Sequence, residues 1–306
     1  MESWRKNPLV FWIVSIPPSV WLFAFFLAPL ALVWVMSFGE KRGIVDIVIT
    51  WTMDNYLRAL DPLYLQIFAK SFWFAGLTTA LCFAAGFPIA IAITFAPSRW
   101  KPILLLLVIL PFWTNLLIRT YALIAVLRTR GFMNFTLEWF WEQGNALLAL
   151  VGLAEYQLLG ERFEALELLY NNFAVVFGLI YVHLPFMVLP LYAALDRMDR
   201  SYIEASLDLG AGQFRTFRSV IIPLALPGII SGIIITFIPA LGSFLTPDLL
   251  GGTDSQMIAN VIERQFKSAN DWPFGAALSF ILMYITFFAL AVRALTSRGK
   301  SAMEAA

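Results

Sequence analysis

The chain has 306 residues, of which 60% are hydrophobic and only 13% charged, and its mean hydropathy is +0.78. A soluble domain carries roughly 25% charged residues, so much of the surface of this chain cannot face water. One cysteine and one histidine exclude an internal disulfide and a metal site built from several such residues. The composition therefore predicts an integral membrane protein, and we expect no nucleic acid among its partners.

The apolar run from about Leu9 to Phe38 is too long for the core of a signal peptide, and no A-x-A-like cleavage site follows it. We interpret it as a retained first span. A helix needs about 20 apolar residues to cross the hydrocarbon core. Six stretches qualify, and they predict an all-α polytopic fold with spans at Val14–Phe38, Phe72–Phe95, Ile103–Leu127, Phe173–Leu195, Leu224–Phe244 and Phe274–Leu295.

The distribution of Lys and Arg predicts the orientation of these spans. With a cytoplasmic N-terminus, the inside segments are short and rich in basic residues, whereas the outside segments are longer and carry fewer. The inside residues would be Arg5, Lys6, Arg99, Lys101, Arg197, Arg200, Arg215, Arg218, Arg293, Arg298 and Lys300. We therefore expect both termini in the cytoplasm.

The remaining organisation is simple. The connection from about Gly131 to Tyr170 is acidic but contains apolar stretches, so we expect one or two short helices on the outer membrane surface. No linker composition interrupts the chain. We predict a single membrane domain over residues 1–306, with a core at about 69–296 and the first span and an outer loop at 1–68.

The segment between the fourth and fifth spans carries the clearest motif. Ser201 followed by Glu204 is a capping-box pattern, which predicts that a short helix begins there. Ile203 and Leu207 are four residues apart and share one face of this helix. Gly210 and Gly212 then end or bend it. The simpler reading is an ordinary capped loop helix.

The same segment resembles the EAA loop of ABC importer permeases, in which Glu-Ala-Ala is followed by a glycine and then by Ile-x-Leu-Pro. Here the pattern begins at Glu204, Ala205 and Ser206, and it continues through Gly210 to Val220 and Ile222–Pro223. The resemblance implies the six-span architecture of type I (MetI-like) importer permeases. It also implies a helix that docks on a cytoplasmic ATPase through Ser201, Glu204, Ala205, Leu207, Asp208 and Gly210.

Three further segments, Leu110–Ala122, Pro247–Gly252 and Asp271–Ala276, are similar to the first permease of spermidine/putrescine importers. The likeness implies a multi-pass protein of the bacterial inner membrane. It implies a second permease that completes a heterodimeric pore, a dimeric ABC ATPase and an extracytoplasmic substrate-binding protein. Lipid would surround the spans. No catalytic or metal-binding residue is expected in this chain, because the partner ATPase would bind ATP and Mg²⁺.

Polar residues inside spans are costly and are functional candidates by default. The candidates for a translocation pathway are Trp113, Thr114, Asn115, Tyr181 and Phe244, although aromatic side chains at membrane interfaces are more often packing than pathway. Arg119 and Asp248 are expected at similar depth and could form a structural ion pair. Alternatively, Arg119 could extend toward the interface, and it would repel a cationic substrate unless it were neutralised.

Two other classes of function are open to test. An ion-coupled secondary transporter predicts carboxylates at mid-membrane, and no Asp or Glu lies well inside any predicted span. A membrane enzyme would need convergent His, Asp or Cys groups. An importer of another small organic solute would share every feature described above, because the binding protein does much of the selecting.

Overall fold

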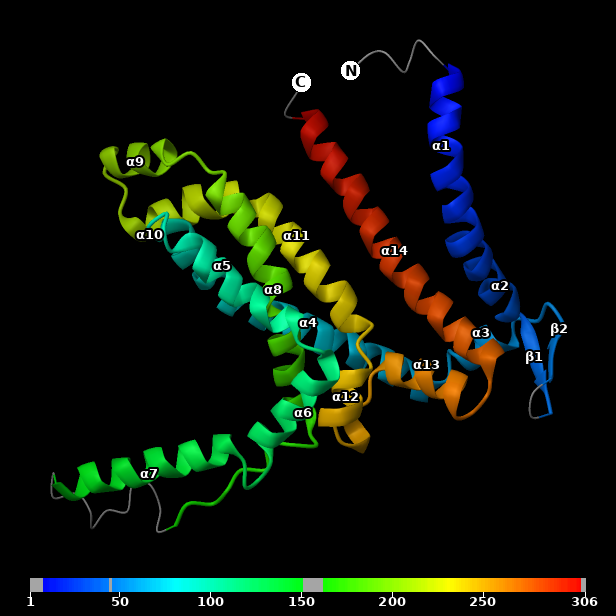
Figure 1. The fold of residues 1–306 in the computed structure, drawn as a ribbon, viewed down its shortest axis with the longest axis horizontal. Coiled ribbons are helices and arrows are strands. Elements are labelled where there is room, and N and C mark those ends of the chain that lie inside the picture. The colour runs from blue at the N-terminus through cyan, green and yellow to red at the C-terminus, as the bar shows by residue number, and fades with distance from the viewer. Residues whose placement is uncertain (1–7, 44–45, 151–161, 304–306) are drawn as a thin grey trace. The chain divides into compact units, whose positions relative to one another are not determined.

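The computed structural model describes residues 8–43, 46–150 and 162–303, whose helices and strands are labelled in Figure 1. The chain groups into two compact units, one of Met1–Gln66 with Val261–Ala306 and one of Ile67–Asn260. The single-domain organisation stays a prediction.

The first unit begins with a long helical run made of α1 (Pro8–Leu22), the π-helical turn η1 (Phe23–Leu27) and α2 (Ala28–Met36). The wider turn precedes Pro29, which has no N–H to donate and whose ring crowds the carbonyl four residues earlier. An antiparallel hairpin follows, with β1 (Gly39–Arg42) paired to β2 (Asp46–Ile49) so that Gly39 faces Ile49. This small hairpin is an addition to the all-α prediction, and its β-branched run Ile47–Ile49 favours extended backbone.

Helix α14 (Trp272–Met303) packs against α2 and against α3 (Asp54–Arg58) within the same unit. The indole N–H of Trp34 donates to the hydroxyl of Tyr284 at 2.7 Å. The guanidinium of Arg58 donates to Asp271 at 2.7 Å and lies 3.9 Å from the centre of the Phe274 ring. These contacts join the first span and the chain that follows it to α14 and the residue just before it.

The second unit contains most of the helices. In chain order, the elements from the unit boundary onward are α4 (Pro62–Phe95), α5 (Lys101–Ile109), η2 (Leu110–Trp113), α6 (Leu116–Leu127), α7 (Phe132–Leu150), α8 (Asn172–Asp196), α9 (Ser201–Asp208), α10 (Gln213–Thr216), η4 (Phe217–Ile221), α11 (Ile222–Leu241), α12 (Leu245–Leu250), η5 (Thr253–Ser255) and α13 (Ile258–Lys267). Helices α4 and α13 cross the boundary between the units.

The core of the second unit lies between α4, α8 and α11, and α8 and α11 run side by side (Figure 1). Small residues allow this close approach, as is usual where helices associate in membranes. A Cβ on Gly228 of α11 would lie 2.4 Å from the Cβ of Ala194 and 2.7 Å from the carbonyl oxygen of Pro190. Glycine is therefore required sterically at this crossing.

The predicted spans are confirmed, with one change. Among the described residues, five helical runs are long and apolar enough to cross a membrane: Val10–Met36, Pro62–Phe95, Asn172–Asp196, Gln213–Leu241 and Trp272–Ala291. The predicted third span is broken instead of continuous, and its parts Lys101–Trp113 and Leu116–Leu148 meet at 96°. Counting that bent pair as one span gives the predicted six.

Candidate functional site

Helix α9, the predicted coupling helix, begins at Ser201 as the sequence indicates, but a different residue caps it. The backbone N–H of Ser201 donates to the carboxylate of Asp199 at 3.0 Å, and the N–H of Tyr202 donates to the Asp199 carbonyl. Hydrogen bonds from the Ser201 backbone and side chain hold the pKa of Asp199 below its ordinary value. The predicted capping box at Ser201 is therefore replaced by an aspartate cap two residues earlier.

Gly210 ends α9, as predicted. Its φ is +82°, in the left-handed region that glycine adopts without strain. The N–H of Gly210 donates to the carbonyl of Leu207, and that of Ala211 donates to the carbonyl of Ser206. This pair of bonds is the Schellman motif. It turns the chain sharply from α9 toward α10.

The side of α9 that faces away from the core carries the predicted coupling residues. All six are exposed, namely Ser201, Glu204, Ala205, Leu207, Asp208 and Gly210, and Tyr202 and Leu209 are exposed beside them. Ile203 is partly buried against the core of the second unit, whereas Leu207 is 43% exposed. The expected apolar face is thus divided, and the outward surface combines two carboxylates with flanking apolar side chains.

Helix α9 is connected mechanically to the long helices. Ile203 packs on the core formed by α4, α8 and α11. The hydroxyl groups of Ser206 and Thr216 lie 2.9 Å apart, which joins α9 to α10. From α10 the chain continues through the π-helical turn η4 into α11, and that turn precedes Pro223. A force applied to α9 would therefore reach α8 and α11 directly.

The break in the third span is encoded locally. The chain leaves the helical conformation at Thr114, whose φ and ψ are −90° and 142°. The hydroxyl of Thr114 donates to the carbonyl of Pro111 at 2.7 Å, and the side chain of Asn115 caps α6 by accepting from the N–H of Leu117 at 2.8 Å. Backbone groups freed inside a membrane need such partners. Thr114 and Asn115 therefore have a structural task, and their pathway role stays a prediction.

Arg119 is 8% exposed and contacts the backbone at the same break in the third span. Its guanidinium donates to the carbonyl of Thr114 at 3.0 Å and lies 5.9 Å and 6.0 Å from the ring centres of Phe112 and Tyr181. Its Nε has no hydrogen-bond partner among the described residues. Arg119 is thus buried between aromatic rings.

The other pathway candidates lie on neighbouring elements. Tyr181 is on α8, and Phe244 precedes α12, where its carbonyl accepts from the Asn260 amide at 2.7 Å. Helix α12, which carries Asp248, packs against α6, which carries Arg119. The pairing of Arg119 with Asp248 stays a prediction. Trp113 is 75% exposed.

Several structural residues were missed by sequence reasoning. In the segment Asp271–Ala276, Asp271 has two structural roles. It forms an ion pair with Arg58, and it accepts a hydrogen bond from the N–H of Phe274 at the start of α14. Lys101 pairs with Asp196 at 2.6 Å and joins the start of α5 to the end of α8. Both ion pairs could be proposed from the sequence, because each combines opposite charges on the same predicted side of the membrane.

No group of three or more His, Cys, Asp or Glu residues in the described ranges could hold a metal ion. The one histidine, His183, is buried and its Nδ1 lies 2.8 Å from the Leu179 carbonyl.

Comparisons with known proteins agree with this architecture. The family model described as "Binding-protein-dependent transport system inner membrane component" matches residues 84–300. The chain is 38% identical to the spermidine/putrescine transport system permease protein PotB of Escherichia coli (strain K12), over 87% of this chain and 90% of that one. It is 36% identical to PotB of Haemophilus influenzae (strain ATCC 51907 / DSM 11121 / KW20 / Rd), over 88% of each chain.

A solved structure shares the fold. It is a chain from the crystal structure of a bacterial ABC transporter involved in the import of the acidic polysaccharide alginate, with a TM-score of 0.66. The match covers 95% of this chain and 98% of that one at 15% sequence identity. At that identity the likeness supports the fold alone.

Proposed function

Because the chain belongs to the family of binding-protein-dependent transport system inner membrane components, we propose that it forms half of the pore of an ATP-driven polyamine importer. The observation that carries the substrate class is the 38% identity to the spermidine/putrescine permease over 87% of this chain. Polyamines are flexible polycations, and aromatic faces attract cations. Trp113, Tyr181 and Phe244 are the aromatic candidates for the pathway.

The proposal assigns α9 to the docking of a dimeric cytoplasmic ATPase, which binds and hydrolyses ATP with Mg²⁺. Three features support it: the outward carboxylates Glu204 and Asp208, the rigid stop at Gly210, and the link from Ser206 to Thr216. A short helix that moves as a rigid body suits the transmission of closure to the spans. This chain itself is then non-catalytic.

A second permease would complete the pore, and a substrate-binding protein would deliver the polyamine from outside. Both termini and α9 would then lie in the cytoplasm, as the distribution of basic residues indicates. A related fold is known in complex with an alginate pentasaccharide-bound periplasmic protein. That complex makes an external partner of this kind a reasonable expectation here.

Uptake of radiolabelled putrescine and spermidine tests the proposal. Cells lacking their own polyamine importers would express this chain with the ATPase, second permease and binding protein that co-purify with it. We expect uptake that disappears when the ATPase cannot hydrolyse ATP. A matched strain with the Glu204→Ala chain should retain the assembled permease pair but lose most uptake.

Two results would contradict the proposal at different levels. Uptake that persists without ATP hydrolysis and follows an ion gradient would establish a secondary transporter. ATP-dependent uptake of another solute, with no polyamine transport, would keep the architecture and change only the substrate. The second outcome has one observation in its favour, because the buried cation of Arg119 beside Tyr181 is unfavourable for a polycation at that point.

A further inference from the structure

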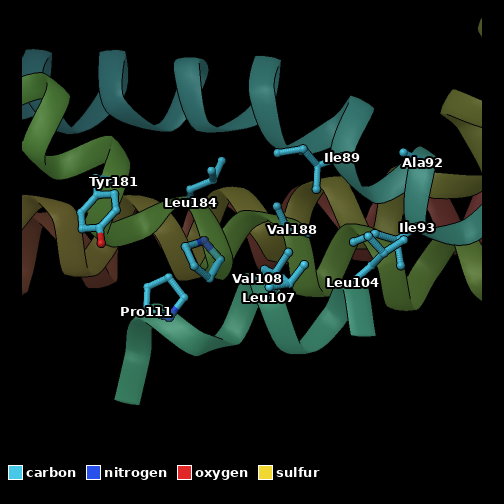
Figure 2. A pocket seen from close by; sticks show the side chains of 11 residues that line it. Ile89, Ala92, Ile93, Leu104, Leu107, Val108, Pro111, Tyr181, Leu184 and Val188 are labelled. Atoms are coloured by element: carbon cyan, nitrogen blue, oxygen red, sulfur yellow. The ribbon is translucent and has the colours of Figure 1, made fainter. Parts of the chain in front are cut away.

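An apolar cavity of about 370 Å³ lies between α4, α5 and α8. Its size falls within the range of roughly 300–1,000 Å³ typical of ligand pockets. The three helices contribute aliphatic side chains, among them Ile89, Ile93, Leu104, Val108, Leu184 and Val188. Figure 2 shows them spread along the helices, with Ile93 and Leu104 toward one end and Pro111 and Tyr181 toward the other.

The shape and lining of this cavity suit a hydrocarbon chain. From Leu104 on α5 to Pro111 in η2 the lining extends by about 10 Å at 1.5 Å per residue. One leaflet contributes roughly 15 Å of hydrocarbon, half of a core about 30 Å thick. The hydroxyl of Tyr181 is the one side-chain polar group among the lining residues, so the cavity offers little to a polyamine or to water.

Basic residues gather at the Ile93 and Leu104 end, where α4 ends and α5 begins. The guanidinium of Arg99 lies 6.0 Å from the Trp100 ring centre. That of Arg200 lies 5.6 Å from the Phe95 ring centre and donates to the carbonyl of Thr94 at 3.4 Å. Arg99 and Arg200 are both exposed, and Arg200 also interacts electrostatically with Asp196. Lys101 already forms an ion pair with Asp196 at 2.6 Å, so this end of the cavity keeps an excess of positive charge that an anion can meet.

We infer that this cavity holds one acyl chain of an anionic phospholipid, whose phosphate lies against Arg99 and Arg200. Basic pockets between membrane helices are suited to such headgroups, and guanidinium groups bind phosphate well. The bound chain would support α5 against α4 and α8, just before the break in the third span. The lipid belongs to the leaflet beside the α4–α5 connection, and its assignment to the cytoplasmic leaflet rests on the proposed topology.

Native mass spectrometry of the complete purified complex tests the site, with phosphatidylglycerol as the anionic probe and phosphatidylcholine as the zwitterionic one. We expect tight binding of the first and weaker binding of the second. Val108→Trp fills the cavity and should weaken phosphatidylglycerol binding by at least about tenfold, which the lost burial of two methylene groups is enough to cause. The control Ile118→Trp, at a 67% exposed position on α6 outside the lining, should bind as the native chain does.

A second pair of variants tests the headgroup without touching the core. Arg99→Gln should weaken binding of phosphatidylglycerol and leave phosphatidylcholine unaffected, whereas Arg130→Gln, an equal change of charge on the α6–α7 connection, should alter neither. Native affinity in both Val108→Trp and Arg99→Gln would overturn the inference. So would efficient cross-linking of Leu107→Cys to the second permease, because protein would then cover the cavity. These readouts do not depend on transport, so failure of the polyamine proposal would be seen separately.

Discussion

Replacing Gly210 by alanine tests whether the sharp stop of α9 matters for coupling. Gly210 has a φ of +82°, and an added Cβ would meet no atom within 4 Å. The cost of the substitution therefore lies in the backbone alone. A left-handed conformation costs an L-residue roughly 1–2 kcal/mol. That energy lowers the population of the native turn by a factor of about 5–30 relative to alternatives.

The chain provides its own controls for this experiment. Gly212 lies two residues further on and also has no atom within 4 Å of an added Cβ, but its φ is −69°. Gly212→Ala should therefore be nearly neutral. Gly210→Asn should fall between Gly210→Ala and the native chain, because asparagine tolerates the left-handed region better than alanine does.

The assay is polyamine uptake per ATP hydrolysed in a reconstituted complex, with thermal unfolding measured in parallel. We expect the order native, Gly212→Ala, Gly210→Asn, Gly210→Ala for coupling efficiency, with little change in the unfolding of the spans. Equal losses for Gly210→Ala and Gly212→Ala would refute the argument from φ. Full activity in Gly210→Ala would show that the turn does not need its native geometry.

Three further predictions concern contacts outside α9. Asp271→Asn should preserve the cap of α14 and weaken only the half-exposed ion pair with Arg58. Asp271→Ala also removes the cap and should lower the free energy of unfolding by about 1 kcal/mol more than Asp271→Asn does, as measured by thermal unfolding. A double-mutant cycle of Arg119→Gln and Asp248→Asn, measured on the free energy of unfolding, should give a coupling energy of about 1 kcal/mol if the two residues pair. Additive losses of stability would exclude the pair. A spin label on α7 should be immersed in lipid at Phe140, which is 60% exposed, and in water at Glu138, which lies on the opposite side of the helix, if α7 lies on the membrane surface.

The spans could be predicted almost completely from the sequence, because a bilayer imposes one requirement on any stretch that crosses it. About 20 apolar residues are needed, and five of the six predicted stretches are unbroken helical runs. The outer connection was predicted in part, since α7 is a helix over Phe132–Leu150. Residues 151–161 of that connection, where a second helix was considered, lie outside the described part of the chain.

The start and stop of α9 were also predictable, because capping and glycine signals are local. The identity of the cap was not, since Asp199 and Ser201 are both good capping residues and only the path of the backbone selects between them. The break at Thr114 shows the same limit. Pro111 and Asn115 are visible in the sequence, but proline within a span is usually tolerated.

What the sequence by itself determined is the membrane class of the protein, the position of its spans and the place of helix α9, because hydropathy and capping act over a few neighbouring residues. The tertiary structure alone decided the contacts between distant segments. It placed Tyr181 beside Arg119, Asp271 beside Arg58, and α4, α5 and α8 around an apolar cavity. These contacts depend on how helices pack, and helix packing depends on the shapes of side chains far apart in the chain.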